Sequence, residues 1–492
     1  MSALPRIVVA APASGHGKTT VATGLMAALR ARGLRVAGHK VGPDYIDPGY
    51  HALATGRPGR NLDPHLVGEE RIVPLLLHGA AAGGPHGDRP ADIAVIEGVM
   101  GLYDGHIGTD GFASTAHVAR LTTSPVILVV DISHASRTIA ATVLGMASFD
   151  PDVRIAGVVL NKAGSVRHSD EVRRALAPLG IPVLGVLQRD DDVTAPSRHL
   201  GLVPAAERPE AARSLDHLAG KVAQSIDLEA VVRIARGAPA LGGTAWSPQV
   251  AMVSAAGGPG GLRDNDNDDD NARPVIALAG GRAFTFRYAE TAELLTAAGC
   301  EVATFDPLTD DRLPEDTAGI YLGGGFPEVH AGELGANQLM LEALRAATAA
   351  GVPAVAECAG LLYLCRSVDG VPMVGTVPSD AAMGPRLTLA YRRSTAVTDS
   401  VLAAAGTEVT GHEFHRTVVT PAAGAEVTGD GASGTARAVS PAWTSAAGPE
   451  GFIRGSVHAS YLHTHWAGHP ALAARFAASA RRFARASSPA RS

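Results

Sequence analysis

The chain has 492 residues, too many for one ordinary hydrophobic core, so we expect two or three domains. Its formal net charge of −6 is small for this length, and its lysines and arginines are spread along the chain, which argues against a nucleic-acid partner or an anionic membrane surface. No apolar run approaches the roughly 20 residues of a membrane span, and the N-terminus lacks the pattern of a signal peptide, so the expected location is cytoplasmic.

The first part of the chain, residues 1–235, alternates short Val- and Ile-rich runs with Ala-, Leu- and Arg-rich segments of helical periodicity. Apolar runs of this length, separated by helices, are typical of a parallel sheet that is covered on both faces. We therefore predict an α/β domain with a parallel sheet. Its expected strands are 6–10, 35–41, 93–98, 126–131, 155–161 and 182–187.

A phosphate-binding loop is expected directly after the first strand. The stretch AAPASGHGKTT ends in Gly-Lys-Thr and precedes a helical pattern that stops at Gly33. At such a turn the backbone N–H groups and the helix dipole attract phosphate, so Lys18 would reach the terminal phosphates and Thr19 would ligate Mg²⁺. Pro12 stands where the loop's first glycine is usual, so an ordinary glycine turn with a surface lysine is the alternative. The residues expected to bind ATP here are Ser14, Gly15, Gly17, Lys18, Thr19 and Thr20.

Carboxylates that follow neighbouring strands are expected to hold the magnesium ion together with Thr19. Glu97 ends an apolar strand, and Asp44 and Asp47 follow the strand at 35–41 in a loop stiffened by prolines. Carboxylate oxygens are the ligands that Mg²⁺ prefers, and the carboxyl ends of parallel strands meet at one edge of the sheet. Solvated turn residues are the alternative interpretation, mainly for the two aspartates.

Two further positions bear on the nucleotide. Asn161 ends the strand at 155–161, where it would either pair with a purine edge of ATP or cap the following helix. Ala13 lies five residues before Lys18, at a position where partition-type ATPases carry a second lysine. The sequence therefore disfavours a dimerising switch ATPase and favours an enzyme that uses ATP on a small substrate.

The segment 236–272 interrupts the alternation, because it is rich in Gly, Pro, Asp and Asn and offers little to bury. We predict a flexible linker here, which separates the ATP-binding domain at 1–235 from a second α/β domain at 273–488. Strands and helices alternate again from Pro274, antiparallel strand patterns follow, and the chain ends with an amphipathic helix.

A cysteine nucleophile is expected in the second domain. Cys358 lies between an apolar strand and a helix, as in a nucleophile elbow, where the helix N-terminus stabilises a thiolate. Two backbone N–H groups would form an oxyanion hole: that of Ala359, directly after Cys358, and that of Gly324, in a glycine run that ends an upstream strand. His463 would take the thiol proton. A buried free thiol is the alternative for Cys358 and the expectation for Cys365.

The two halves together resemble the corrinoid a,c-diamide synthases of cobalamin biosynthesis, which join a dethiobiotin-synthetase-like ATP domain to a class I glutamine amidotransferase domain. The resemblance implies that Cys358 and His463 release ammonia from glutamine, and that MgATP converts two acetate carboxylates of a corrinoid macrocycle into acyl phosphates for amidation. Asp104 matches a family position associated with substrate activation. Six motifs in family order carry the resemblance: SGHGKTT, HKVGPDYIDPGYH, VIEGVMGLYDG, AECAGLLYL, GHEFH and ASYLHTHW.

The sequence departs from the resemblance at two positions and leaves some alternatives open. His465 stands two residues after His463, where many class I amidotransferases have an acid, which favours a Cys–His dyad, and Ala359 stands where glycine is common. The macrocycle is either metal-free hydrogenobyrinic acid, which an Ala-, Arg- and Gly-rich composition favours, or cobyrinic acid. The alternatives are a cobyric acid synthase that amidates other side chains and a regulatory ATP-binding module with an inactive amidotransferase domain. A homodimer is also left open.

Overall fold

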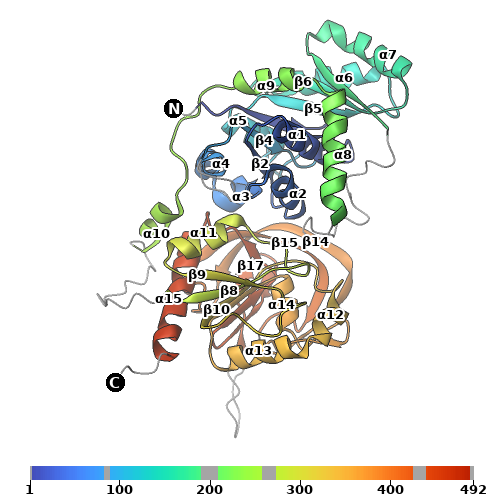
Figure 1. Cartoon of the computed structure of the whole chain (residues 1–492). Helices are drawn as coiled ribbons and strands as arrows, with labels where there is room; N and C mark the ends of the chain where they lie inside the picture. Colours follow the sequence, from blue (N-terminus) through green and yellow to red (C-terminus); the bar gives the residue numbers. More distant parts are fainter. Residues whose placement is uncertain (1–2, 82–88, 190–208, 257–272, 425–438, 488–492) are drawn as a thin grey trace. The chain divides into compact units, whose positions relative to one another are not determined.

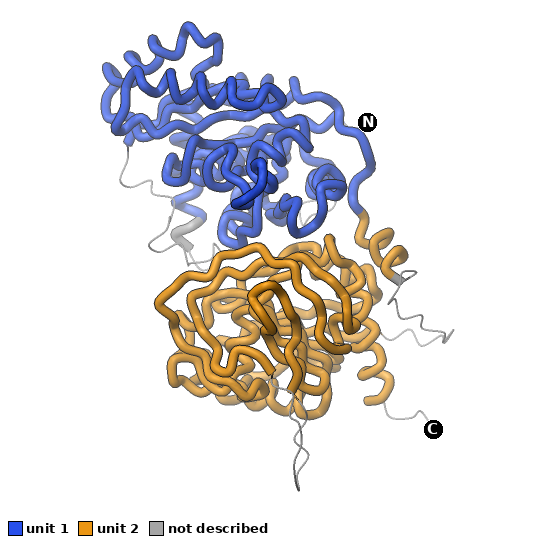
Figure 2. Tube along the Cα trace, turned by 180° about the vertical axis from the view of Figure 1, so that it is seen from behind, with its two compact units in different colours: residues 1–246 blue, residues 247–492 orange. Residues whose placement is uncertain are grey.

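The chain divides into two compact units, Met1–Trp246 and Ser247–Ser492 (Figures 1 and 2). This computed structural model describes residues 3–81, 89–189, 209–256, 273–424 and 439–487. Part of the predicted linker, 257–272, lies outside the described residues. In its described part, Trp246 donates its backbone N–H to Pro74 O in the first unit, and the next residues form a helix of the second unit. The domain limits 1–235 and 273–488 stay predictions.

The first unit is built on a parallel seven-stranded sheet with the strand order β3-β2-β4-β1-β5-β6-β7, which confirms the predicted α/β fold. The strands are β1 (Arg6–Ala10), β2 (Val36–Val41), β3 (Arg60–Leu62), β4 (Ile93–Glu97), β5 (Val126–Asp131), β6 (Ile155–Ala163) and β7 (Val183–Gln188). The helices are α1 (Lys18–Ala31), α2 (Ile46–Thr55), α3 (Pro64–Val67), α4 (Ile72–Ala80), α5 (Thr115–Leu121), α6 (Thr138–Phe149), α7 (Val166–Leu176), α8 (Pro209–Ser225) and α9 (Leu228–Arg236), with short 3₁₀ turns at Glu69–Arg71 and Ala177–Leu179.

Burial on both faces explains why the strands of this sheet are almost wholly apolar. On one face, Ile7 and Val9 of β1 join a core to which α1 and α8 contribute, and these two helices lie side by side (Figure 1). The intervening residue, Val8, is also fully buried, as are Ile96 and Leu128 in the neighbouring strands. A parallel sheet covered on both faces requires continuous apolar strands. The polar residues that follow these strands therefore lie together at the carboxyl edge of the sheet.

The second unit contains two seven-stranded sheets. The first has the order β16-β19-β20-β11-β10-β8-β9, with parallel pairing from β20 to β9, and the second contains β13-β12-β14-β15-β21 with β17 and β18. The strands are β8 (Val275–Ala279), β9 (Glu301–Phe305), β10 (Thr317–Leu322), β11 (Ala354–Glu357), β12 (Ser367–Val368), β13 (Val371–Pro372), β14 (Asp380–Ala396), β15 (Glu408–Thr420), β16 (Val439–Ser440), β17 (Trp443–Ser445), β18 (Gly448–Glu450), β19 (Phe452–Arg454), β20 (Val457–Ser460) and β21 (His463–Thr464). The helices are α10 (Pro248–Ala256), α11 (Ala289–Ala297), α12 (Ala331–Ala336), α13 (Gln338–Ala349), α14 (Ala359–Leu364) and α15 (Pro470–Ser487).

The C-terminal helix α15 has the predicted amphipathic character. Its apolar side, which includes Leu472 and Phe476, is buried, and the helix packs against β10, α10 and α11. Within the described parts of the chain, we find no helix that combines the length and apolarity needed to cross a bilayer.

Candidate functional sites

The loop between β1 and α1 has the backbone shape of a phosphate-binding loop. Gly15 and Gly17 have φ values of +87° and +90°, and a Cβ atom on Gly17 would lie 2.2 Å from Asn161 Nδ2. Asn161 donates this amide nitrogen to His16 O at 2.9 Å, and Lys162 Nζ donates to Gly15 O at 2.8 Å. The end of β6 therefore fixes the loop, and this contact is the one that the structure gives to Asn161; its predicted contact with a purine stays a prediction.

Lys18 begins α1 at the end of this loop. Its Nζ donates to Met100 O at 2.5 Å and to Ala13 O at 3.4 Å, so the ammonium group lies between the phosphate loop and the loop after β4. Asp104 lies in the latter loop, where its Oδ2 accepts from the Gly101 N–H at 2.9 Å. Both side chains thus border one stretch of the sheet edge, and the role in substrate activation expected of Asp104 stays a prediction.

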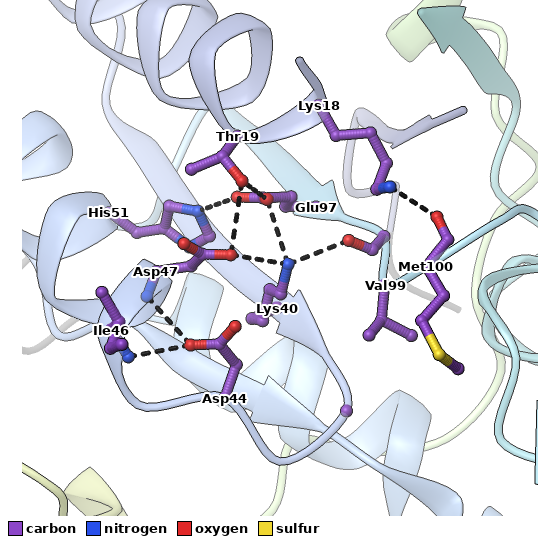
Figure 3. Close-up of polar contacts among 12 residues, drawn as sticks. Lys18, Thr19, Lys40, Asp44, Ile46, Asp47, His51, Glu97, Val99 and Met100 are labelled. Carbon is purple, nitrogen blue, oxygen red and sulfur yellow. Dashed lines mark hydrogen bonds and ion pairs between the residues drawn. The ribbon is translucent and has the colours of Figure 1, made fainter. Parts of the chain in front are cut away.

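Thr19, Asp47 and Glu97 come together beside the loop (Figure 3). Thr19 Oγ1 donates to Glu97 Oε1 at 2.6 Å and lies 3.4 Å from Asp47 Oδ2. Lys40 Nζ is 2.7 Å from Asp47 Oδ2 and 3.0 Å from Glu97 Oε1. On the far side, His51 Nε2 is 2.7 Å from Glu97 Oε2. Three of the four predicted metal-binding side chains are thus adjacent, and Lys40 and His51 hold the carboxylates in place.

Asp44 has a different place in the structure. Its Oδ1 accepts from the backbone N–H groups of Ile46 and Asp47, at 2.8 and 3.1 Å, and so supports the start of α2 (Figure 3). This contact fixes the residue that faces Thr19 and Lys40. The direct metal contact expected of Asp44 stays a prediction.

The buried charges of this cluster stabilise one another. Burial lowers the pKa of Lys40, but the negative charges of Asp47 and Glu97 outweigh it and raise the pKa above its ordinary value. Burial would raise the pKa of Glu97, but Lys40 and the hydrogen bond from His51 hold it well below its usual range. Burial and the Glu97 charge raise the pKa of Asp47. Lys40 and Glu97 are therefore ionised at neutral pH.

The donor set of this cluster fits magnesium better than a softer metal. Thr19, Asp47 and Glu97 offer only oxygen atoms, which is the chemistry that Mg²⁺ requires, and Mg²⁺ is usually bound by one or two carboxylates together with substrate phosphates. Across the described residues, no group of three His, Cys, Asp or Glu side chains could hold a metal ion by itself. A metal ion here would need oxygen ligands from a nucleotide phosphate.

In the second unit, Cys358 lies at the sharp turn between β11 and α14. Its φ of +50° is in the left-handed region, as in a nucleophile elbow, and its side chain is only 3% exposed. Burial and the charge of Glu328 raise the pKa of the thiol to about 12, although hydrogen bonds from the Ala359 and Gly325 N–H groups lower it. At rest Cys358 is a protonated thiol, and two backbone donors face its sulfur.

The structure favours Gly325 over the predicted Gly324 as the second donor. Gly324 gives its N–H to Phe286 O at 3.0 Å in a two-way backbone bridge, so this donor is already used. Gly324 instead allows a close approach, because a Cβ atom there would lie 2.4 Å from His463 Cε1. The Gly325 N–H contacts the Cys358 sulfur, as does the Ala359 N–H, so these two groups are the backbone donors at the thiol. The oxyanion role expected of Gly324 and Ala359 stays a prediction.

His463 is fully buried in β21, where it pairs with His412 of β15. The two rings stack with centroids 4.9 Å apart. Burial and the neighbouring His415 lower the pKa of His463 to about 3, so its imidazole is neutral at physiological pH. A neutral imidazole against the glycine run beside Cys358 is in the protonation state that a general base needs.

Comparisons with known proteins bear on both sites. Residues 7–203 match the CobQ/CobB/MinD/ParA nucleotide binding domain, and residues 275–471 match the CobB/CobQ-like glutamine amidotransferase domain. The chain is 57% identical over 483 residues to the hydrogenobyrinate a,c-diamide synthase of Thermobifida fusca, with 96% of each chain covered. The corresponding enzyme of Streptomyces coelicolor is 54% identical, with 96% of this chain and 97% of the relative covered. The chain belongs to the a,c-diamide synthase family.

This family also includes relatives named for another substrate. The cobyrinate a,c-diamide synthase of Gloeobacter violaceus is 43% identical to this chain, with 95% of each chain covered. The resemblance expected from the sequence is therefore confirmed. The two domain matches also confirm the predicted order, with the nucleotide-binding domain first and the amidotransferase domain second.

Several residues at the two sites of this a,c-diamide synthase family member were not predicted. Lys40 and His51 both lie in the motif HKVGPDYIDPGYH, but the contacts of Lys40 with Asp47 and Glu97, and of His51 with Glu97, were not predicted. Lys162 follows Asn161 directly, at the carboxyl edge of the sheet where ligands bind. The sequence pointed to the glycine run as the source of a donor, but the choice of Gly325 within that run depends on the pairing of Gly324 with Phe286.

Proposed function

We propose that this chain is a glutamine-dependent and ATP-dependent a,c-diamide synthase, which converts the a- and c-acetate carboxylates of hydrogenobyrinic acid into amides. The observation that carries the proposal is the presence in one chain of an elbow thiol with two inward N–H donors and of a phosphate loop with oxygen ligands for magnesium. Support for the substrate comes from identity, which is 57% and 54% to the two hydrogenobyrinate enzymes and 43% to the cobyrinate enzyme.

In the amidotransferase unit, Cys358 Sγ attacks the side-chain amide carbon of glutamine. His463 takes the thiol proton and passes it to the leaving nitrogen, so ammonia departs and a thioester to Cys358 remains. The N–H groups of Gly325 and Ala359 stabilise the oxyanion of the tetrahedral intermediate. Water then hydrolyses the thioester, which yields glutamate and restores the thiol.

In the nucleotide unit, ATP binds with its phosphates on the loop from Ser14 to Thr20. Lys18 stabilises the terminal phosphates while a substrate carboxylate attacks the γ-phosphorus, which gives an acyl phosphate and ADP. Ammonia then attacks the acyl carbon and inorganic phosphate leaves. Thr19, Asp47 and Glu97, with Asp44 behind them, would hold Mg²⁺, which supplies charge neutralisation on the phosphates. Asp104 would take part in substrate activation. Asn161 would hold the phosphate-binding loop and contact the adenine base of ATP.

Cobyrinic acid is the second candidate substrate, because a relative named for it covers nearly the whole chain. We also propose that the enzyme is cytoplasmic and has no nucleic-acid or membrane partner. Its oligomeric state is either a monomer or a homodimer, and light scattering will distinguish the two.

The test is incubation of the purified chain with ATP, Mg²⁺, glutamine and each macrocycle in turn, with amide additions followed by mass spectrometry. We expect two amides on hydrogenobyrinic acid. Two amides on cobyrinic acid alone would transfer the assignment to the second substrate, and no amide on either would overturn the proposed function.

A further inference from the structure

The residue before the nucleophile, Glu357, is a buried acid with partners on two other strands. It ends β11 and is only 4% exposed. Its Oε2 accepts from the hydroxyl of Tyr321 at 2.8 Å, and its Oε1 accepts from the hydroxyl and the backbone N–H of Thr464 at 2.8 and 3.3 Å. Trp466 Nε1 donates to the same threonine hydroxyl at 3.1 Å. The carboxylate is therefore the centre of a buried hydrogen-bond network.

This network joins the two reacting residues of the thiol site. Glu357 directly precedes Cys358, and Thr464 directly follows His463. The strand that carries the histidine, β21, has only two residues, so its own backbone pairing with β15 gives it little support. The carboxylate bonds to Thr464 are an additional connection between the strand of the nucleophile and the strand of the base.

The position two residues after the catalytic histidine, where many class I amidotransferases have an acid, is a histidine in this chain. His465 occupies it, and its Nε2 is 3.7 Å from Glu290 Oε2 while its ring stacks on Tyr288 at 4.0 Å. In a catalytic triad the acid keeps the histidine in the correct orientation. Since a histidine stands at that position, an acid that acts on His463 in this chain has to lie elsewhere, and Glu357 is connected to it through Thr464.

We propose that Glu357 is a positioning residue of the thiol site, which holds His463 in reach of Cys358 through its two hydrogen bonds to Thr464. This inference rests on the proposed glutamine hydrolysis at Cys358. A displacement of about 1 Å at a reacting group can reduce a rate by about 100-fold, so the loss of these bonds is expected to slow the chemical step while leaving glutamine binding nearly unchanged.

The charge of Glu357 gives a second, independent readout. Burial raises its pKa to about 7, against the hydrogen bonds from Tyr321 and Thr464, which lower it. Its negative charge, like that of Glu328, raises the pKa of the Cys358 thiol, while the Ala359 and Gly325 N–H groups lower it. Replacement of Glu357 by an uncharged residue should therefore make Cys358 more reactive towards iodoacetamide at a given pH, even where glutamine turnover falls.

The experiment compares Glu357→Leu, Glu357→Gln, Thr464→Val and the double variant Glu357→Leu/Thr464→Val in the full chain. We expect kcat for glutamine hydrolysis to fall about 100-fold in Glu357→Leu and about 10-fold in Thr464→Val, with KM within about threefold of wild type. The double variant should lose no more than Glu357→Leu, because both changes break the same contact. Glu357→Gln should stay within about fivefold of wild type, since its amide oxygen still accepts from Thr464.

Two controls separate positioning from general damage. Synthesis with free ammonia depends on the other unit and should be unchanged in every variant. Tyr363→Phe removes a buried hydroxyl of α14 that has no hydrogen-bond partner among the described residues, and it should leave kcat unchanged. Iodoacetamide labelling of Cys358, followed by mass spectrometry, should shift to lower pH in both Glu357 variants.

The proposal is overturned if Glu357→Leu hydrolyses glutamine at the wild-type rate, if the losses of the single variants multiply in the double variant, or if Glu357→Gln is as slow as Glu357→Leu. If Glu357→Leu does not fold, Thr464→Val and Glu357→Gln decide in the same way, because the first must be slow and the second fast. A wild-type chain that releases no glutamate would instead overturn the proposed function.

Discussion

Both sites contain buried titratable side chains, but these side chains are in different charge states. In the nucleotide unit, Lys40 and Glu97 are ionised because each stabilises the charge of the other. In the amidotransferase unit, burial raises the pKa of Cys358 to about 12 and lowers the pKa of His463 to about 3, so both are neutral. One site is kept charged by its neighbours, and the other is kept neutral by burial.

The difference follows from the chemistry that each site is proposed to perform. The phosphates of ATP are charged from the moment that ATP binds, so the site can use permanently charged side chains. These side chains are paired with one another, which avoids the energetic cost of an isolated buried ion. A thiol and an imidazole become charged only when glutamine is attacked, and backbone N–H donors then stabilise the new oxyanion. Fixed charge therefore suits the first reaction, and charge created on demand suits the second.

Replacement of the nucleophile should separate the two sites most completely. Cys358→Ser is expected to lower glutamine-dependent synthesis by about 10³-fold or more, because a serine hydroxyl beside a neutral imidazole is a far weaker nucleophile there. Synthesis with free ammonia should be retained, and both rates can be followed by mass spectrometry of the macrocycle. Cys365→Ala is the matched control, since this thiol is buried in the core and should leave both rates within a few-fold of wild type.

The independence of the units fails if Cys358→Ser also loses ammonia-dependent synthesis while remaining folded. That result would mean that the thiol takes part in amide transfer at the other site.

Loss of the loop lysine should affect the charged site in the opposite way. Lys18→Ala is expected to reduce both glutamine-dependent and ammonia-dependent synthesis by about 10²- to 10³-fold, because it removes a cation from the phosphates. Hydrolysis of glutamine to glutamate should continue. Arg32→Ala, at the exposed end of the same helix, should change none of the three rates. A Lys18→Ala chain that still forms amides with ammonia would show that the loop does not serve ATP.

The sequence predicted the elements whose signal is local. The strands of the first sheet were recognisable because both of their faces are buried, whereas β3 was missed because Arg60–Leu62 is short and two of its three residues are polar. The closeness of Thr19, Asp47 and Glu97 could be predicted because the carboxyl ends of parallel strands meet at one edge.

Features that depend on long-range contacts could not be predicted. Lys40 is buried in β2, and its charge is explained by Asp47 and by Glu97, which lies 57 positions away in the chain. The choice between Gly324 and Gly325 depends on the direction in which each N–H points, which the bridge to Phe286 decides. The partners of Glu357 likewise lie on β10 and β21.

The pairing of charges in the nucleotide unit should appear in the pH dependence of synthesis. Lys40 and His51 hold the pKa of Glu97 below its usual range against the effect of burial, so Lys40→Met should raise that pKa. Activity that needs ionised Glu97 would then be lost at a higher pH as the solution is acidified. We expect ammonia-dependent kcat/KM for ATP at pH 6, relative to pH 8, to fall about 10-fold more in Lys40→Met than in wild type.

Lys40→Arg is the matched control, because it keeps the positive charge beside Glu97. Its acid limb should stay close to that of wild type. An unchanged acid limb in Lys40→Met would contradict the view that this pair keeps the metal-binding carboxylate ionised.

Neutral burial in the amidotransferase unit should appear as acid sensitivity of its stability. Burial lowers the pKa of His458 to about 3, while the unfolded chain has the ordinary value of 6.5. Below pH 6.5 the unfolded state therefore binds more protons than the folded state. The free energy of unfolding is unaffected by His458 above pH 6.5 and falls between pH 6.5 and pH 3, by up to about 1.4 kcal/mol per pH unit. In His458→Gln, whose side chain does not titrate, the loss of unfolding free energy between pH 6.5 and 5 should be smaller by about 2 kcal/mol. Trp443, whose ring lies edge-on to His458 at 5.1 Å, reports the transition by fluorescence in urea. Equal pH dependence in the two proteins would mean that His458 is solvated or protonated in the folded state, and the contrast between paired charge in one unit and neutral burial in the other would then not extend beyond the thiol site.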